Sequence, residues 1–377
     1  MKLQNSLILV LTFIPMISAR NWIAYIGTYT TGVSKGIYAY RYQPETGGLT
    51  PNGLAAETVS PSFLAMHPNG RILYAVNESQ RYNGMPNSGG VSAFTIDPVT
   101  ARLTLLNTVA SHGADPCHLV VDHSGRWLFV ANYTGGRIAG FPVHEDGSLG
   151  EASQVVQHTG ASRVDPQRQE AAHVHSVNLS DDNRFLYVSD LGLDSIFVYR
   201  LDAATGMLTE HAITRSAPGA GPRHIAFTPD RRFAYSFAEL NSMITFYGHT
   251  AATAGLEEVQ RVSSLPAGFT GPRSGAEIAV DPTGRFLYAS NRGHDSIATF
   301  NIDPEQGLLR LVGHVSTSGR TPRHFTVDPA GTHLFAANQD TSNIVSYRID
   351  ANTGALTPVG DPIVVGDPVC ILFVKLP

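Results

Sequence analysis

The feature that most constrains this chain is a repeated unit whose starts lie 46 to 58 residues apart. Each copy begins with a short apolar run, turns at a sequence such as D-P-x-G-R, and returns through an aromatic-rich run. Repeats of this length are typical of solenoids, propellers and similar arrays. A half-copy, PVCILFV, begins at Pro368, and the six full copies are PSFLAMHPNGRILYAVNE from Pro61, PCHLVVDHSGRWLFVANY from Pro116, VHSVNLSDDNRFLYVSDL from Val174, PRHIAFTPDRRFAYSFAE from Pro222, GAEIAVDPTGRFLYASNR from Gly275 and PRHFTVDPAGTHLFAANQ from Pro322.

Each copy carries the pattern of a four-stranded antiparallel sheet. The apolar and aromatic-rich runs have the pattern of a hairpin. A third run such as SIFVYRLD follows, and a fourth begins with G-x-L, as in GLLRLVG. Because no helical period of comparable length appears, the pattern favours the blades of a β-propeller over a solenoid.

The two ends of the chain together supply one further blade. NWIAYIGT from Asn21, GIYAYRYQ from Gly36 and GGLTPNG from Gly47 match the second, third and fourth strands of the unit. The first strand is missing there, and PVCILFV at the C-terminus provides it. A ring closed in this way leaves no open sheet edge. We therefore predict an all-β, seven-bladed β-propeller, formed by residues 20–377 as a single domain.

The first 19 residues have the pattern of a secretory signal peptide. Lys2 precedes an apolar stretch from Leu7 to Ile17, and Ser18 and Ala19 are small residues suited to cleavage. An uncleaved anchor is the alternative, but the stretch is shorter than the roughly 20 residues that span a bilayer. We expect export to the periplasm or the extracellular space, without stable membrane association after cleavage. A cytoplasmic location is the alternative if the signal is not used.

Charge and cysteine content exclude several kinds of partner and cofactor. The formal net charge is -5 and no run of Lys or Arg occurs, so neither nucleic acid nor an anionic membrane is an expected partner. Metal-binding spacings such as C-x-x-C or H-E-x-x-H are absent, and no cofactor is expected. The two cysteines, Cys117 and Cys370, lie far apart in sequence and fall on blades separated by one other blade, so we expect free thiols.

Two positions of the repeat vary from copy to copy. The first enters the first strand and the second leaves the second strand. Since these strands are antiparallel, both positions lie at the same mouth of the central channel, here called the candidate mouth. The first position holds Ser62, Cys117, His175, Arg223, Ala276, Arg323 and Val369, and the second holds Thr28, Glu78, Tyr133, Leu191, Glu239, Arg292 and Gln339.

Several of these residues have side chains suited to catalysis on a small anion. Guanidinium groups bind carboxylate or phosphate oxygens in pairs, and a histidine beside a carboxylate can move protons near neutral pH. The alternative is that these charges are solvated groups around a water-filled channel. The candidate catalytic residues are His175, Arg223, Glu239 and Arg292, and the candidate substrate-binding residues are Glu78, Arg323 and Gln339.

Other recurring or inserted residues have simpler interpretations. His118, His224 and His324 recur at one position and are expected to bond a neighbouring blade, and Asn77, Asn132, Asn291 and Asn338 are assigned to turns. The tract from His158 to His175 is a long insertion before the third blade. Long loops in compact folds are often functional. It is either an ordinary loop or a lid that brings Arg163, Arg168 or His173 to the candidate mouth.

The motifs YIGTYT, HVHSVNLSDDNRFLYVSDLG, PRHIAFTPDRRFAYSFAE and GRFLYASNR resemble, in order, those of the seven-bladed propeller lactonase family. The family includes propeller-type 6-phosphogluconolactonases and a fungal carboxy-cis,cis-muconate cyclase. The resemblance covers essentially all residues after the signal peptide. It implies a metal-independent site at His175 in HVHSV, Arg223 in PRH, Glu239 in SFAEL and Arg292 in SNRG. The apparent signal peptide departs from the cytoplasmic members.

Three functions follow as hypotheses. The first is hydrolysis of a sugar lactone, as in conversion of 6-phosphogluconolactone to 6-phosphogluconate, with Glu239 or His175 as general base and with Arg223 and Arg292 stabilising the oxyanion. The second is a carboxymuconate-type lactonising cycloisomerase that uses the same residues. The third is a non-catalytic exported binding protein, because fold alone does not fix function.

Overall fold

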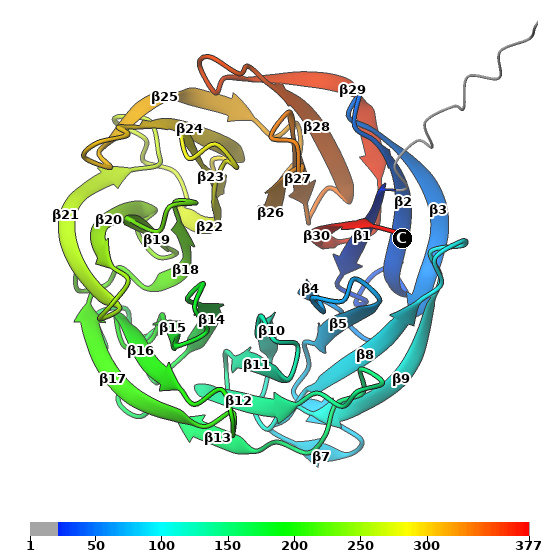
Figure 1. Ribbon diagram of the computed structural model, residues 1–377. Helices are drawn as coiled ribbons and strands as arrows, with labels where there is room; N and C mark the ends of the chain where they lie inside the picture. The colour runs from blue at the N-terminus through cyan, green and yellow to red at the C-terminus, as the bar shows by residue number, and fades with distance from the viewer. Residues whose placement is uncertain (1–21, 377) are drawn as a thin grey trace, which may run out of the picture.

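The computed structural model describes residues 22–376, which form seven four-stranded antiparallel sheets around a central channel (Figure 1). The sheets are numbered here as blades 1 to 7. Blades 1 to 3 contain β4 (Leu64–Met66), β5 (Ile72–Asn77), β8 (Gly90–Ile96) and β9 (Leu103–Ala110); β10 (Pro116–Val121), β11 (Trp127–Asn132), β12 (Arg137–Pro142) and β13 (Gln154–Gln157); β14 (Val174–Leu179), β15 (Phe185–Asp190), β16 (Ser195–Leu201) and β17 (Leu208–Arg215).

The other four blades continue in the same direction around the ring. In blade 1, the connection between β5 and β8 contains a separate two-stranded hairpin, β6 (Arg81–Tyr82) and β7 (Met85–Pro86). Blades 4 to 7 contain β18 (Pro222–Phe227), β19 (Phe233–Ala238), β20 (Met243–Thr250) and β21 (Gly255–Ser263); β22 (Ser274–Val280), β23 (Phe286–Arg292), β24 (Ser296–Ile302) and β25 (Leu309–Ser316); β26 (Pro322–Val327), β27 (His333–Asn338), β28 (Asn343–Ile349) and β29 (Leu356–Val364); β1 (Trp22–Thr28), β2 (Gly36–Gln43), β3 (Gly48–Glu57) and β30 (Pro368–Lys375).

Both ends of the described chain meet in blade 7. Its strand order is β3-β2-β1-β30, so the C-terminal strand is the innermost one, and β30 lies beside β1 in Figure 1. The two strands pair along their lengths, from Trp22 opposite Lys375 to Thr28 opposite Pro368. The predicted fold and its closure by both chain ends are therefore confirmed.

Burial falls from the centre of each blade to its rim. Every residue of the second strand β5 is buried, whereas the outermost strand β17 is mostly exposed. Buried tyrosines on second strands tie neighbouring blades together, because the Tyr74, Tyr235 and Tyr288 hydroxyls donate to carbonyls in the outer turn of the next blade. Cys117 and Cys370 are buried and unpaired, as expected from their spacing.

The recurring asparagines lie inside strands instead of in the predicted turns. Asn77, Asn132 and Asn338 end β5, β11 and β27, and Asn291 is the penultimate residue of β23. Each side-chain amide donates to a carbonyl of the segment that arrives from the preceding blade, such as Ser111 for Asn132. This bond gives a buried polar group its partner, and it explains why the residue recurs.

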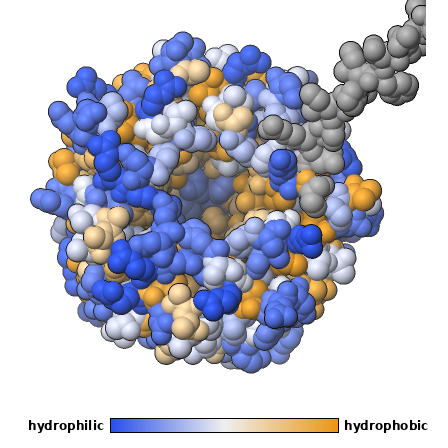
Figure 2. Space-filling view, viewed as in Figure 1, coloured by the Kyte–Doolittle hydropathy of each residue, from blue (hydrophilic) through white to orange (hydrophobic). Residues whose placement is uncertain are grey.

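A space-filling view shows the ring hollowed at its centre, with hydrophilic residues around much of the opening (Figure 2). Within residues 22–376, no helix has the length and apolar character needed to cross a membrane. The predicted signal peptide, residues 1–19, lies outside the residues that the structure describes.

Candidate active site

In four of the seven blades, a β-bulge places one side chain at the candidate mouth. In blades 2, 3, 4 and 6 the pairing between first and second strands shifts immediately after the first strand begins. A bulge leaves its extra residue outside the ladder and redirects its side chain. The variable position recognised in the sequence is this bulged position, and in these four blades it holds Cys117, His175, Arg223 and Arg323.

Glu239, which directly follows β19, is the centre of the site. Arg292 Nη2 lies 2.9 Å and Arg223 Nε 3.2 Å from Glu239 Oε2. His175 Nε2 lies 3.7 Å from the same oxygen, and Arg168 Nη2 lies 2.5 Å from Oε1. The four predicted catalytic residues therefore meet, from three different blades.

The arginines determine the charge of Glu239. Burial opposes ionisation of this carboxyl, but Arg292, Arg223 and Arg168 outweigh burial and hold its pKa well below the usual range. Burial, together with the Arg223 charge, lowers the pKa of His175 well below 6.5. At neutral pH the site therefore contains an ionised carboxylate, a neutral imidazole and three guanidinium groups.

A second ion pair lies at the same mouth. Arg323 Nη2 is 3.9 Å from Glu78 Oε1, and the Arg323 guanidinium lies over the Tyr29 ring, 5.3 Å from its centroid. Glu78 accepts hydrogen bonds from the Tyr29 hydroxyl at 2.9 Å and from the Ser62 hydroxyl. Two of the three predicted substrate-binding residues thus form a unit beside the Glu239 cluster.

The third, Gln339, is half-buried at the adjoining position of the ring. Its main-chain N–H donates to the Thr321 carbonyl at 3.0 Å. Within residues 22–376 its side chain forms no hydrogen bond with the other candidate residues.

The insertion contributes a side chain to the site. Arg168 donates both to Glu239 and to the Tyr133 hydroxyl, the latter at 3.0 Å. Next to it, buried Gln169 anchors the segment through the Leu191 carbonyl and Asp194. Of the two interpretations of the insertion, the one in which it brings a side chain to the candidate mouth therefore holds for Arg168.

The other two residues of the insertion named from the sequence do not contact Glu239. Arg163 is exposed. His173 stacks on the Tyr133 ring with centroids 4.5 Å apart, and its Nε2 lies 3.0 Å from the acceptor Glu170 Oε1.

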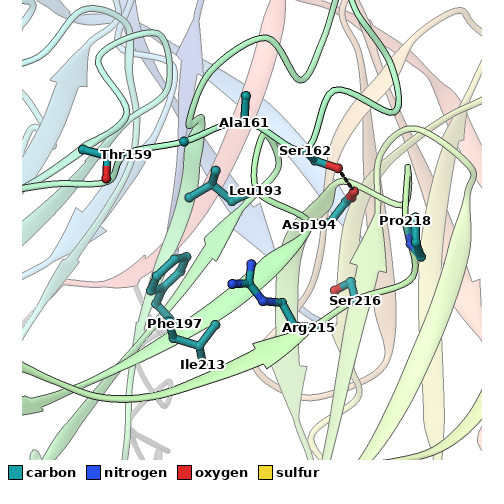
Figure 3. Close-up of a pocket in the computed structure, with 11 residues that line it drawn as sticks. Thr159, Ala161, Ser162, Leu193, Asp194, Phe197, Ile213, Arg215, Ser216 and Pro218 are labelled. Carbon is teal, nitrogen blue, oxygen red and sulfur yellow. Dashed lines mark hydrogen bonds between the residues drawn. The ribbon is translucent and has the colours of Figure 1, made fainter.

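A cavity of about 560 Å³ lies between the insertion and blade 3 (Figure 3), and its lining does not include Glu239 or the residues paired with it. Its walls come from residues 159–162 of the insertion and from blade 3, including Phe197 and Arg215. Asp194 in its wall accepts the Ser162 hydroxyl, as Figure 3 shows, and also the Gly219 and Gly221 amides. The Asp194 carboxylate therefore holds the insertion in place, and its hydrogen bonds account for its burial.

Comparison with known proteins identifies the family of this site. Residues 23–373 match the family described as "Lactonase, 7-bladed beta-propeller". The chain belongs to the seven-bladed β-propeller lactonase family. The match extends over nearly all of the described residues.

Relatives within the lactonase family carry two kinds of name. The chain is 38% identical to a protein of Bacillus subtilis named 6-phosphogluconolactonase, over 81% of this chain and 84% of that protein. It is 35% identical to a Formosa agariphila protein of the same name, over 80% and 85% of the two chains. The solved structure of a periplasmic gluconolactonase from Pseudomonas aeruginosa has a TM-score of 0.89 and 36% identity, covering 94% of this chain and 99% of that one.

Several residues of the candidate site were not singled out from the sequence. Tyr29 and Ser62 hold Glu78, and Tyr133 holds Arg168. Ser62 and Tyr133 do stand at the two variable positions, but their hydroxyls carry no charge that would single them out. Glu277 was also missed. It stands where His118, His224 and His324 stand in other blades, and that departure from the repeat was a usable signal.

Proposed function

We propose that this lactonase-family chain hydrolyses a sugar lactone at the candidate mouth, with 6-phosphogluconolactone to 6-phosphogluconate as the reference reaction. The observation that carries the proposal is the cluster of His175, Arg223 and Arg292 around the carboxylate of Glu239. Membership of the lactonase family supports a cyclic ester as the bond that is cleaved. The name of the Bacillus subtilis relative supports the phosphorylated substrate.

His175 is the general base in this proposal. Its imidazole is neutral at pH 7 because burial lowers its pKa, so it can accept a proton. The oxygens of Glu239 are already engaged by Arg168, Arg223 and Arg292, which makes this carboxylate less available as a base. His175 removes a proton from water as the water oxygen attacks the lactone carbonyl carbon. The imidazolium then returns the proton to the ring oxygen as the ester C–O bond breaks, so one water is consumed. Glu239, 3.7 Å away, stabilises the imidazolium.

Arg223 and Arg292 stabilise the negative charge that develops on the carbonyl oxygen. Both are buried or nearly so, and each already points a nitrogen at Glu239 Oε2, Arg223 through Nε at 3.2 Å and Arg292 through Nη2 at 2.9 Å. Preorganised donors in a site that excludes water lower the barrier by about 3 kcal/mol each. Glu239 keeps both guanidinium groups in position before the substrate arrives.

The charge balance of the mouth favours an anionic substrate. Four arginines, Arg168, Arg223, Arg292 and Arg323, face the carboxylates of Glu78 and Glu239. Guanidinium groups are well suited to phosphate and carboxylate oxygens. Arg168 is the most exposed of the four, with 40% of its side chain accessible, and is suited to a phosphate that enters from solvent.

We also propose that the chain is exported through residues 1–19. The apolar stretch from Leu7 to Ile17 supports this, as does the similarity to a gluconolactonase described as periplasmic. Amino-terminal sequencing of the protein recovered from its source distinguishes export from a cytoplasmic location. A mature chain that begins near Arg20 supports export, and an intact Met1 contradicts it.

The test of function compares two lactones with one enzyme preparation. Proton release is followed with 6-phosphogluconolactone and with gluconolactone, and His175→Gln is run in parallel to subtract spontaneous hydrolysis. Faster turnover of the phosphorylated lactone is expected. Turnover of gluconolactone alone contradicts the phosphate assignment, and no turnover of either contradicts the hydrolase assignment. Product analysis with a carboxymuconate tests the cycloisomerase, which consumes no water.

A further inference from the structure

A second layer of ionisable side chains lies one residue deeper in the channel than the bulged positions. The layer consists of His118, His224, Glu277 and His324, all buried. They belong to blades 2, 4, 5 and 6, yet the His118 and His224 rings lie 5.2 Å apart, as they would at the axis of the ring. The proposed reaction does not use these four side chains, so the burial of ionisable groups in this layer requires an explanation.

Glu277 is the exception in this layer. Its Oε1 lies 2.8 Å from Nδ1 of His224 in the preceding blade, and its Oε2 lies 3.5 Å from Nε2 of His324 in the following blade. Within residues 22–376, no three histidine, cysteine, aspartate or glutamate side chains have the geometry to hold a metal ion. Burying a carboxylate without a cationic partner lowers the free energy of unfolding. Glu277 therefore has a role that the histidine found at this repeat position in blades 2, 4 and 6 does not fill.

The glutamate reverses the tautomer of one histidine. In the two blades that follow the usual pattern, the next blade's main-chain N–H donates to Nδ1, from Val177 to His118 at 3.5 Å and from Ile371 to His324 at 3.3 Å. Those two rings must therefore carry their proton on Nε2. His224 Nδ1 instead faces the Glu277 carboxylate, which only accepts, so His224 carries its proton on Nδ1.

The reversed tautomer matters because of what faces the other nitrogen. His224 Nε2 lies 3.3 Å from Arg223 Nη1, and arginine can only donate. An unprotonated His224 Nε2 can accept the Arg223 Nη1–H. In the tautomer with the proton on Nε2, the His224 Nε2–H would point at the Arg223 Nη1–H, and two donors would face each other. Burial and the Arg223 charge lower the pKa of His224 well below 6.5, which keeps this nitrogen free of a proton. Arg223 Nη1 also donates to the Ala276 carbonyl at 2.7 Å, while Nε faces Glu239.

We propose that Glu277 and His224 are positioning residues that fix the Arg223 guanidinium for the reaction at the mouth. The chain of contacts runs from the Glu277 carboxylate to His224 Nδ1–H, and from His224 Nε2 to Arg223 Nη1–H. Arg223 thereby presents Nε to Glu239, and its guanidinium group is held in one orientation beside the site of the developing oxyanion. The effect of this pair on kcat rests on the proposed lactonase function, whereas the position of the His224 proton does not depend on that function.

The tautomer is measured by ¹⁵N NMR of the imidazole nitrogens in the full chain, with His224→Gln used to assign the resonances. His224 is expected to carry its proton on Nδ1, opposite to His118 and His324. A His224 proton on Nε2 overturns the proposal whether or not the protein hydrolyses lactones. This measurement uses the wild-type chain and so does not depend on whether a variant folds.

The kinetic test compares Glu277→Leu with Glu277→Gln. Leucine removes the acceptor for His224 Nδ1–H, and misplacing a catalytic group by about 1 Å lowers rates by up to about a hundredfold. We expect kcat to fall about tenfold to a hundredfold, with a smaller change in KM. Glutamine keeps an acceptor oxygen and is expected to retain kcat within about threefold of wild type. The control His118→Gln, in the same layer but without a hydrogen bond to Arg223, leaves kcat unchanged.

Two kinetic outcomes contradict the positioning role. A folded Glu277→Leu protein with wild-type kcat shows that Arg223 needs no support from this layer. Equal loss in Glu277→Leu and Glu277→Gln assigns the effect to the negative charge instead of the hydrogen bond. If wild-type protein hydrolyses no lactone, the proposed function fails by itself, and the NMR measurement still decides the Glu277–His224 pair.

Discussion

Arg168 and Glu239 meet across the candidate mouth with 2.5 Å between Nη2 and Oε1, although one belongs to a loop and the other to the end of a propeller strand. Among residues 22–376, Arg168 is the one arginine paired with Glu239 that does not come from a blade, and it is 40% exposed, whereas Arg223 and Arg292 are largely buried. The insertion therefore completes a site that the propeller alone would leave with two arginines around this carboxylate.

Arg168→Gln tests this contribution to substrate binding. Loss of the exposed guanidinium is expected to raise KM for 6-phosphogluconolactone about tenfold, the usual scale for one charge-assisted hydrogen bond. The KM for uncharged gluconolactone should change less. Arg163→Gln, at an exposed position in the same insertion, is the matched control and should leave both constants unchanged. Equal effects of Arg168→Gln on both lactones contradict a role in binding the anionic group.

Glu239→Gln is expected to reduce both activity and stability. The substitution leaves buried Arg223 and Arg292 without their carboxylate, and breaking a buried pair in this way costs about 3 to 5 kcal/mol. Denaturant unfolding and kcat are measured together. Glu257→Gln, on the exposed outer strand β21, is the control. If the free energy of unfolding of Glu239→Gln equals that of wild type, Arg223 and Arg292 are solvated well enough to be stable without the Glu239 carboxylate.

The stabilising effect of Glu239 has a defined pH dependence. Because the folded-state pKa is depressed below the ordinary value of 4.5, the unfolded chain binds the proton first as pH falls. The difference in unfolding free energy between wild type and Glu239→Gln should be constant from neutral pH to about 4.5, and should shrink progressively below it. A difference that is already lost between pH 7 and 5 disagrees with an arginine-stabilised carboxylate.

His175 predicts the shape of the pH–rate profile. A base with a pKa lowered by burial stays unprotonated below pH 6.5, so kcat of the wild-type enzyme should remain flat through that value and decline only at more acidic pH. The profile is measured with spontaneous hydrolysis subtracted at each pH. A decline centred at or above pH 6.5 contradicts the assignment of His175 as a buried neutral base.

Closure of the ring can be tested away from the site. The Tyr42 hydroxyl of blade 7 donates to Asp328 Oδ2 of blade 6 at 2.8 Å, in a buried contact. Tyr42→Phe removes one hydrogen bond to a charged acceptor and should lower the unfolding free energy by about 1.5 to 3 kcal/mol. Tyr38→Phe, whose hydroxyl has an exposed contact with the Lys35 amide, is the control. Equal stability of the two variants would show that this blade interface does not need the bond.

The fold was predictable because each blade repeats the same pattern. Seven copies average out local ambiguity, and the missing first strand at the N-terminus has its match at Pro368. The candidate catalytic residues could be named for a related reason, because His175, Arg223 and Glu239 stand at positions that vary between copies while the rest of the repeat is kept. Comparing the copies with one another therefore separates residues that build a blade from residues that line the mouth.

The remaining features depend on geometry that the repeat does not encode. The bulge at Arg223 is a register shift, visible only once the two strands are paired. Arg168 lies in an insertion without a counterpart in other blades, so nothing in the sequence fixes where its side chain lies. The asparagines were misassigned because a residue such as Asn132 favours turns by local propensity, while the carbonyl that it binds, Ser111, comes from a distant segment.

The most direct test of the lactonase site is the rate at which the purified chain consumes 6-phosphogluconolactone, measured beside His175→Gln at pH 7. We predict that wild-type protein hydrolyses the lactone well above the spontaneous rate, while the folded variant falls close to that rate. A variant as active as wild type, or a wild-type rate no higher than the spontaneous one, would contradict the account of His175 and Glu239 as a hydrolytic site.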